Sequence, residues 1–258
     1  MTASAEIKVE RLDNGAIVRI VLARPKANIL DGPTVDAITE VLAKEGAEAS
    51  VRAVIFDHEG PNFSFGASVA EHLPGHVHAM LLRFHDLFRA LIKVSKPLVA
   101  VVRGQCLGGG LELAAFCHRV FADPTAKLGQ SEINLAVFAP MASLVLPRRL
   151  SRQADADDLL LTGRTVDAKA ALAMGLVDQV DADPGAAALD WVRTNFHGKS
   201  AAALGCAVAA ARHEFNRAVL AEIGRLETLY LDGLMKKTDP VEGLKAFLEK
   251  RAPVWTHA

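Results

Sequence analysis

The segment from Pro97 to Phe116 constrains the fold of this chain most strongly. An apolar strand, Pro97–Val102, leads into Gly104 and then into three consecutive glycines, Gly108 to Gly110. The residues that follow, Leu111–Cys117, have the composition of a buried helix. A glycine turn between a strand and a helix leaves backbone N–H groups unpaired at the positive end of the helix dipole. The sequence therefore predicts a site for a negatively charged oxygen at this turn.

Two glutamates lie in apolar surroundings close to this turn in the sequence. Glu112 lies one turn inside the predicted helix, and Glu132 follows in the segment KLGQSEINL. Each alone could be structural, Glu112 as a salt-bridged core residue and Glu132 as part of a turn. Burial raises the pKa of a carboxyl group toward neutrality, which suits it for proton transfer. Together with the anion site, the pair indicates a general acid and a general base.

The composition is that of a soluble globular protein of 258 residues. Hydrophobic residues make up 51%, the net charge is −1, and basic runs do not exceed two residues, which argues against nucleic-acid binding. Apolar runs are too short to span a membrane, and the N-terminal segment lacks the pattern of an export signal. Cys106, Cys117 and Cys206 are expected to be buried thiols in a reducing compartment. We therefore expect a cytoplasmic protein.

Hydrophobic periodicity predicts alternating strands and helices up to about residue 184, and mostly helix after Gly185, with a break near Asp239-Pro240. A boundary between an α/β core and a helical region is expected between Pro184 and Gly198. The predicted strands are Ile7–Leu12, Ala16–Leu22 (joined through a tight Asn14-Gly15 turn), Ala53–Phe56, Pro97–Val102, Arg119–Ala122 and Leu176–Val180. The predicted helices of the core are 32–44, 80–92, 111–117, 141–150, 154–161 and 168–174, and His58–Gly66 is expected to be a loop.

Three other kinds of site fit the sequence less well. The glycine spacing matches neither a dinucleotide-binding fingerprint nor a phosphate-binding P-loop. Neither Ser64 nor Ser143 lies in a G-x-S-x-G elbow, which argues against a serine nucleophile. A group of histidines lacks the cysteines or carboxylates that would complete a metal site: His72, His76, His78 and His85.

The segment GQCLGGGLELAAFCHRVFADPTAKLGQSEINL resembles the signature of the crotonase, or enoyl-CoA hydratase, superfamily. Further matching motifs extend the resemblance over nearly the whole chain: RPKANIL, FSFGAS, TGRTVDAKAALAMGLVDQV and EGLKAFLEKRAPVW. The resemblance implies an α/β fold, with a ClpP-like spiral of ββα units over residues 1–190 that carries a CoA-thioester site. A helical oligomerisation region would follow over residues 191–258. The implied partners are an acyl-CoA thioester and further copies of the chain, as a trimer or a dimer of trimers. No metal or redox cofactor is implied, because coenzyme A is part of the substrate.

The same resemblance assigns roles to the residues around the glycine turn. The backbone N–H groups of Ala67 and Gly109 would form an oxyanion hole for the thioester oxygen. The hydratase branch uses two glutamates at this spacing, and Glu112 and Glu132 match both. Their joint presence favours the addition or removal of water. Which glutamate activates the water and which delivers the proton stays open at this point.

Other residues are expected to bind the substrate by the same analogy. Lys26 and Ala27 would border the CoA channel, and Gly108 belongs to the oxyanion turn. Phe247 and Lys250 resemble residues that reach the adenine and phosphate groups bound by a neighbouring subunit.

Two motifs depart from the usual hydratase pattern. An A-G-A-D motif is replaced by Phe65-Gly66-Ala67-Ser68, and a glycine-rich motif is replaced by Ala139–Ser143, which includes Met141 and follows Val137-Phe138. Both changes add apolar bulk around the acyl pocket, so Phe65, Ser68 and Met141 are expected to line it. A flat cyclic acyl group fits such a pocket better than a long flexible chain.

The two altered motifs together resemble the cyclic dienoyl-CoA hydratases of anaerobic aromatic degradation. The implied reaction converts cyclohexa-1,5-diene-1-carbonyl-CoA to 6-hydroxycyclohex-1-ene-1-carbonyl-CoA. The alternatives are a short-chain enoyl-CoA hydratase, or another acyl-CoA isomerase or hydrolase of the same fold. A non-catalytic RNA-binding homologue is a further alternative, against which the near-neutral charge and the intact glutamate pair argue.

Overall fold

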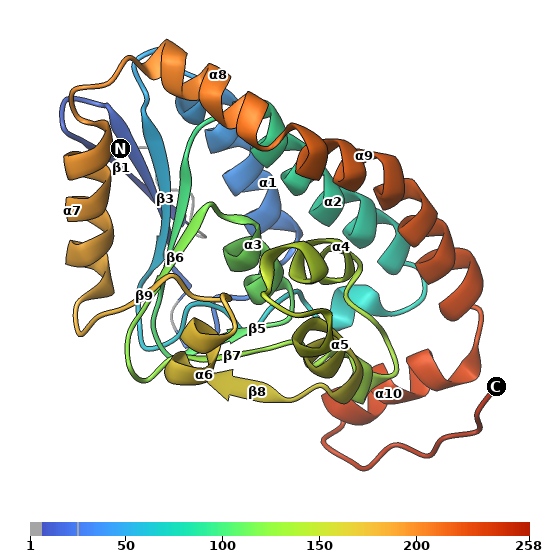
Figure 1. Cartoon of the computed structure of the whole chain (residues 1–258). Helices are drawn as coiled ribbons and strands as arrows, with labels where there is room; N and C mark the ends of the chain where they lie inside the picture. The colour runs from blue at the N-terminus through green and yellow to red at the C-terminus, as the bar shows by residue number, and fades with distance from the viewer. Residues whose placement is uncertain (1–6, 25) are drawn as a thin grey trace.

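The computed structural model describes residues 7–24 and 26–258 (Figure 1). The first six residues of the segment inspected for an export signal lie outside the described residues, as does Pro25 of the RPKANIL motif. No helix of the described ranges is long and apolar enough to cross a membrane.

A six-stranded sheet forms the centre of the molecule, with the strand order β1-β2-β3-β4-β6-β9. β1 and β2 are antiparallel and the other neighbouring strands are parallel. The predicted Asn14-Gly15 turn joins β1 to β2, and Asp13, Asn14 and Gly15 all have positive φ values there. The strands are β1 Ile7–Leu12, β2 Ile17–Leu22, β3 Ala53–His58, β4 Leu98–Val102, β6 Arg119–Ala122 and β9 Gln179–Val180.

A smaller three-stranded sheet has the order β5-β7-β8, formed by Gln105–Leu107, Lys127–Gly129 and Thr165–Asp167. Twice, the chain passes from a strand of the large sheet to a strand of the small sheet and then to a helix. β4 and β5 lead to α3 (Gly109–Phe116), and β6 and β7 lead to α4 (Pro140–Arg149). This is the strand–strand–helix order that the resemblance implies, and α3 packs directly against β5 of the small sheet.

The remaining helical elements vary widely in length, and two π-helical turns occur among them. Before residue 200 they are α1 Gly32–Val41, the π turn η1 Leu42–Gly46, the short 3₁₀ turn η2 Ala70–His72, α2 Val77–Val94, the short 3₁₀ turn η3 Glu132–Leu135, α5 Gln153–Thr162, α6 Ala168–Ala173 and α7 Pro184–Phe196. After it they are α8 Ala201–Ala211, α9 His213–Thr228, the π turn η4 Leu229–Leu234 and α10 Thr238–Leu248.

Both faces of the central strands β2, β3 and β4 are covered, which explains why these strands are mainly apolar. Side chains alternate between the faces along each strand. In β3, Val54 and Phe56 belong to the main core, and Ala53 and Ile55 pack toward Ala188 and its neighbours on α7. Figure 1 shows α7 on one side of the sheet and α1, α2 and α3 on the other.

The structure corrects two predicted strand ends. β3 continues through Asp57 and His58, which were expected to leave the strand, because buried Asp57 accepts hydrogen bonds from both Arg19 and Arg103. β9 contains only Gln179–Val180, because the amides of Leu176 and Val177 bond to Ala171 at the end of α6 instead.

The C-terminal third confirms one prediction and corrects another. The helices break at Met235–Lys237, just before the Asp239-Pro240 pair near which a break was expected. Pro240 lies in the first turn of α10, where its missing N–H is not needed. Cys206 was expected to be buried but is exposed on α8, whereas Cys106 and Cys117 are buried.

A division of the chain between residues 190 and 191 falls within α7. Because this helix packs against β3, β4 and β6, it belongs to the layered core. The helices that lie away from the sheet begin with α8, which has no buried residue.

Candidate active site

The glycine turn at the start of α3 brings Glu132 over the helix N-terminus. Gly108 is the N-cap of α3 and has a φ of 52°, a left-handed conformation that favours glycine. A Cβ atom at Gly108 would lie 2.6 Å from Oε1 of Glu132. The turn therefore needs glycine for two reasons, its backbone conformation and the room that the carboxylate occupies.

Two backbone amides lie beside each other at this turn. Gly109 is the first residue of α3, so its N–H has no acceptor within the helix. A Cβ on Gly109 would lie 3.1 Å from the backbone nitrogen of Ala67. Within the described ranges, neither the Gly109 nor the Ala67 amide donates a hydrogen bond to another protein group. Two free, adjacent donors at the positive end of a helix form an anion site.

Ser64 holds the segment that presents Ala67. Its hydroxyl donates to the backbone oxygen of Asn28 (2.7 Å) and accepts from the amide of Gly66 (2.9 Å). Ser64 was considered above as a nucleophile, and its fully buried position and two backbone partners give it a structural role instead.

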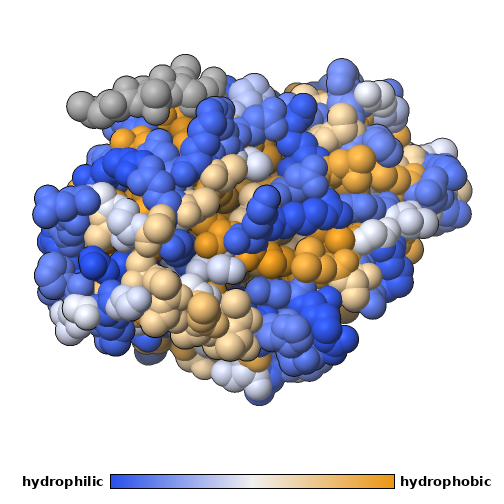
Figure 2. Space-filling view, turned by 90° about the horizontal axis from the view of Figure 1, so that it is seen from above, coloured by the Kyte–Doolittle hydropathy of each residue, from blue (hydrophilic) through white to orange (hydrophobic). Residues whose placement is uncertain are grey.

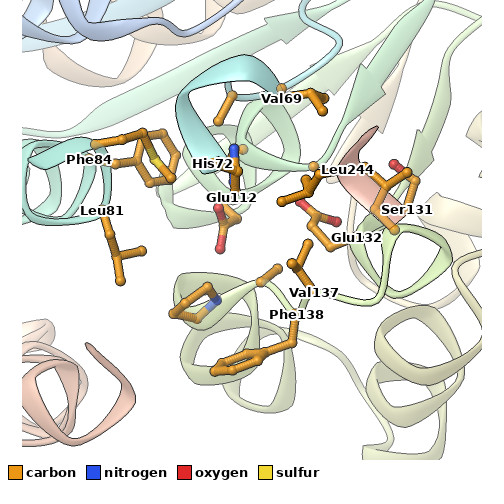
Figure 3. A pocket seen from close by; sticks show the side chains of 18 of the residues that line it. Val69, His72, Leu81, Phe84, Glu112, Ser131, Glu132, Val137, Phe138 and Leu244 are labelled. Carbon is orange, nitrogen blue, oxygen red and sulfur yellow. The ribbon is translucent and has the colours of Figure 1, made fainter. Parts of the chain in front are cut away.

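A cavity of about 260 Å³ lies next to the two amides and contains both glutamates (Figure 3). Its walls come from η2, α2, the start of α3, residues 131–140, η4 and α10. Phe84 and Leu81 of α2 line it, and Val137 and Phe138 face them from the segment before α4. The cavity is therefore mainly apolar, with the carboxyl groups among its few polar groups.

Glu112 is fixed by the beginning of α4. Pro140 occupies the first turn of this helix, where proline is favoured. The Ala142 amide in the same turn donates to Oε1 of Glu112 (2.8 Å). Burial raises the pKa of Glu112 to about 7, although the hydrogen bonds from α4 favour the ionised form. The group can therefore exist in either protonation state near neutral pH.

Glu132 begins the 3₁₀ turn η3, and a neighbouring amide side chain contacts its carboxyl group. Burial, followed by the charge of Glu112, raises the pKa of Glu132 to about 8. With its amide nitrogen turned toward Glu132, buried Gln130 donates to Oε2 (2.9 Å) and Oε1 (3.2 Å). Gln130 was not among the predicted site residues. Gln130 lies directly after β7 and two residues before Glu132. This proximity in the sequence is the signal that could have identified it.

Not every residue expected to bind the substrate lines this cavity. Phe65, Gly108 and Phe247 do line it. Met141 does not, because its side chain points into the core and is fully buried. Ser68 also lies outside the lining, and its backbone oxygen bonds to the ring of His72 instead.

The two expected CoA-channel residues lie beside the site rather than in the cavity. The backbone oxygen of Ala27 accepts from the amide of Phe65 (2.9 Å), which brings the loop next to a lining residue. Lys26 is exposed, and its backbone oxygen accepts from Asn62 (2.9 Å). The loop that carries both residues is therefore anchored to the segment that forms the anion site.

Phe247 and Lys250, which were expected to reach the ligand of a neighbouring subunit, differ in their position relative to the cavity. Phe247 of α10 lines the cavity of its own chain, and its side chain is also 56% exposed. Lys250 follows α10, is exposed and does not line the cavity. Within one chain, α10 thus closes one side of the site.

Two further polar residues of the lining come from distant parts of the sequence. His72 lines the cavity, and its Nδ1 lies 2.7 Å from the backbone oxygen of Ser68. Burial lowers the pKa of His72, which favours the neutral ring. Tyr230 of η4 also lines the cavity. Neither was predicted, since His72 had been considered only as a metal ligand.

Within the ranges that the structure describes, no group of histidine, cysteine, aspartate or glutamate side chains is arranged to hold a metal ion. Two of the four histidines discussed above contact other groups instead. His72 contacts the backbone oxygen of Ser68, and buried His85 contacts Glu227 of α9 (2.8 Å).

Comparison with known proteins places this site in a family. The family model described as enoyl-CoA hydratase/isomerase matches residues 13–258. The chain belongs to the enoyl-CoA hydratase/isomerase family. This family is the crotonase superfamily of the predicted resemblance, and the predicted fold is confirmed. The crystal structure of an enoyl-CoA hydratase from Mycobacterium avium superposes with a TM-score of 0.84 at 26% identity, covering 98% of this chain and 100% of that chain.

Two curated members of the family carry more specific names. The cyclohexa-1,5-dienecarbonyl-CoA hydratase of Thauera aromatica is 46% identical, over 98% of this chain and 98% of its own. The (E)-benzylidenesuccinyl-CoA hydratase of the same organism is 32% identical, over 94% of this chain and 96% of its own. Both names describe hydratases of CoA thioesters.

Proposed function

We propose that this member of the family hydrates a conjugated cyclic dienoyl-CoA. The reaction converts cyclohexa-1,5-diene-1-carbonyl-CoA and water to 6-hydroxycyclohex-1-ene-1-carbonyl-CoA. The observation that carries the proposal is the pair of carboxyl groups, Glu112 and Glu132, on one apolar cavity beside two free amides. The similarity to the Thauera aromatica cyclohexa-1,5-dienecarbonyl-CoA hydratase supports the choice of acyl group.

The first step of the proposed reaction uses the anion site. The thioester oxygen accepts hydrogen bonds from the amides of Ala67 and Gly109, which draws electron density from the ring toward the carbonyl group. Glu112, the carboxyl group with the lower pKa, takes a proton from a water molecule. The oxygen of that water forms a bond to the ring carbon β to the carbonyl group. The electron pair of the attacked double bond moves onto the thioester, which becomes a dienolate.

The second step returns the electron pair to the ring. Glu132, protonated near neutral pH, delivers its proton to the distant end of the dienolate, and the thioester carbonyl group re-forms. One double bond is left in the ring, conjugated with the carbonyl group, and the hydroxyl group lies on the neighbouring carbon. The two glutamates have then exchanged protonation states, and proton exchange with solvent resets them. The proposed chemistry uses no metal or redox cofactor, because coenzyme A enters as part of the substrate.

A panel of acyl-CoA esters tests the substrate assignment. We expect the cyclic dienoyl-CoA to gain one water, detected by mass spectrometry, with a kcat/KM at least about 10²-fold above that for crotonyl-CoA. The ratio reflects a flat ring filling an apolar cavity that a short linear chain leaves partly empty. A higher kcat/KM for crotonyl-CoA would instead identify a short-chain enoyl-CoA hydratase. Turnover without a change in mass would identify an isomerase, and salt-dependent RNA binding without turnover would identify a binding protein.

The two carboxyl groups predict a bell-shaped pH dependence of kcat/KM. Activity needs Glu112 ionised and Glu132 protonated. Acidification through the raised pKa of Glu112, about 7, removes the base, and alkalinisation through the pKa of Glu132, about 8, removes the acid. The maximum of kcat/KM should therefore lie between pH 7 and 8. Both limbs of the pH profile report the titration of the two interacting carboxyl groups together. A rate that stays constant from pH 5 to pH 9 would contradict this assignment.

We further propose that the chain assembles as a homo-oligomer, a trimer or a dimer of trimers, through the helices after the core. The helix α8 is composed almost entirely of small and apolar residues and buries none of them within the chain. Leu220 and Leu229, on and after α9, are about half exposed (48% and 49%). Figure 2 views the molecule from the side on which α8 and α9 lie in Figure 1, and hydrophobic residues are exposed on that face. Apolar surface of this kind is typical of subunit interfaces.

A further inference from the structure

Tyr230 carries a buried hydroxyl group without a partner. The residue is 1% exposed, and its hydroxyl oxygen makes no hydrogen bond within the described ranges. A buried hydroxyl without a hydrogen bond destabilises the folded state, and phenylalanine would fill the same space without that cost. Tyr230 is the only tyrosine in the 258 residues. The hydroxyl group therefore suggests a partner that is absent from the chain itself.

The surroundings of Tyr230 indicate where that partner lies. Tyr230 lines the cavity that contains Glu112 and Glu132. Its ring packs against Phe138 on the same cavity, with ring centroids 5.2 Å apart. Its backbone oxygen accepts from the amide of Met235 (2.8 Å), which closes a π-helical turn. Such turns interrupt the regular helix and occur frequently at functional sites. The ring of Phe138 and the π-helical turn thus fix the Tyr230 side chain at the edge of the acyl pocket.

The phenol remains a hydrogen-bond donor in this environment. Burial, followed by the negative charges of Glu132 and Glu112, raises the pKa of Tyr230 above its ordinary value of 10. The two carboxyl groups already receive hydrogen bonds, from Gln130 and from Ala142. An acyl ring made only of carbon and hydrogen would displace water from the cavity and leave the phenol unpaired. An oxygen atom on the acyl ring would satisfy it.

We propose that the hydroxyl group of Tyr230 donates a hydrogen bond to the oxygen that hydration adds to the acyl ring. Tyr230 is then a specificity-determining residue that favours oxygenated cyclic acyl groups over purely hydrocarbon ones. The inference rests on the proposed function for the identity of the ring. Its contribution is a binding contact to the acyl ring, separate from the proton transfers of the two glutamates.

Two inert thioesters test this contact without turnover. Benzoyl-CoA and 2-hydroxybenzoyl-CoA both carry a flat ring, and the second has its oxygen on the carbon next to the one bearing the thioester, as in the proposed product. Their aromatic rings neither add nor lose water in this reaction. We expect calorimetry to show that the preference of the enzyme for 2-hydroxybenzoyl-CoA over benzoyl-CoA falls about 5–10-fold in Tyr230→Phe, which corresponds to one hydrogen bond.

A matched variant and a stability measurement complete this test. Thr228→Val removes an exposed hydroxyl group two residues away, on α9, and should retain the wild-type preference. Because the Tyr230 hydroxyl has no partner among the residues that the structure describes, Tyr230→Phe should unfold at or above the wild-type temperature. An unchanged ratio of dissociation constants in Tyr230→Phe overturns the proposal, as does a lowered unfolding temperature, which would reveal an internal partner.

A spectroscopic measurement reports on the same hydrogen bond directly. Because the chain has one tyrosine, enrichment with tyrosine labelled with ¹³C at Cζ gives a single resonance. We expect 2-hydroxybenzoyl-CoA to shift this resonance further than benzoyl-CoA does, because only the former offers an acceptor. Equal shifts overturn the proposal. The dienoyl-CoA hydration assay is independent, so an enzyme that lacks this activity but shows the ligand preference refutes the proposed function and leaves the Tyr230 contact standing.

Discussion

Replacing Glu112 by glutamine should lower kcat for the cyclic dienoyl-CoA by about 10²–10⁴-fold, the range that positioned acid–base groups contribute. The amide of glutamine can still accept the hydrogen bond that Ala142 donates to Oε1, so the local geometry is retained. It cannot take a proton from water at neutral pH. Steady-state kinetics measure the loss, and the dissociation constant of benzoyl-CoA should change less than about threefold, because the ring and the oxyanion contacts are unaffected.

Glu132→Gln should lower kcat by a similar factor, because no carboxyl group then delivers the proton to the ring. Glu40→Gln is the matched control, since Glu40 is exposed on α1 and pairs with Lys44. This control should keep the wild-type kcat. Wild-type rates in either Glu112→Gln or Glu132→Gln would remove that residue from the mechanism.

The stability of Glu112→Gln separates lost chemistry from lost folding. The folded-state pKa of Glu112, about 7, lies above its ordinary value of 4.5. As the pH rises through this interval, ionisation favours the unfolded chain, so the wild-type enzyme loses stability. Glutamine does not ionise. The difference in unfolding temperature, Glu112→Gln minus wild type, should therefore be larger at pH 8 than at pH 5. A variant that is inactive and also relatively less stable at pH 8 would indicate damage to the fold.

Much of the site could be predicted from the sequence because its main parts are local. The strand, the glycine turn and the helix with Glu112 follow each other within about 20 residues, and each has a strong sequence signal. The anion site is a consequence of that order, since a helix that begins at Gly109 leaves its first amide free. Glu132 was identified by its motif, and the chain then returns it to the same turn.

The incorrect predictions concern side-chain direction and distant contacts. Met141 lies in a motif close to the cavity, but its place in the first turn of α4 directs its side chain into the core, while neighbouring Pro140 lines the cavity. The hydrogen bond from Ala142 to Glu112 connects residues 30 positions apart. No local pattern specifies such a contact.

The C-terminal region was predictable in type but not in detail. Its composition predicts helices, yet no local pattern predicts the π turn that carries Tyr230 or the packing of its ring against Phe138. The exposure of Cys206 has a different origin. An apolar helix is expected to be buried, and the surface of α8 remains open within a single chain.

Replacing Gly109 by alanine should lower kcat by about 10²–10³-fold, the loss measured when one oxyanion donor is removed from comparable sites. A Cβ atom at this position would lie 3.1 Å from the backbone nitrogen of Ala67 and 3.0 Å from Cζ of Phe84. The methyl group must therefore push the two amides apart or displace the aromatic ring. Either movement takes the donors away from the position where the enolate oxygen develops its charge.

The same substitution at Gly224 isolates this effect from helix propensity. Gly224 lies within α9, and a Cβ atom there would meet no atom of the described residues within 4 Å. Gly224→Ala should therefore keep the wild-type kcat and gain stability, because alanine favours a helix over glycine by about 1 kcal/mol. Gly109→Ala also places alanine in a helix, so its loss of kcat should exceed any loss of stability. If Gly109→Ala keeps the wild-type kcat, the Gly109 amide does not bind the enolate oxygen, and the proposed hydration loses the contact on which its first step depends.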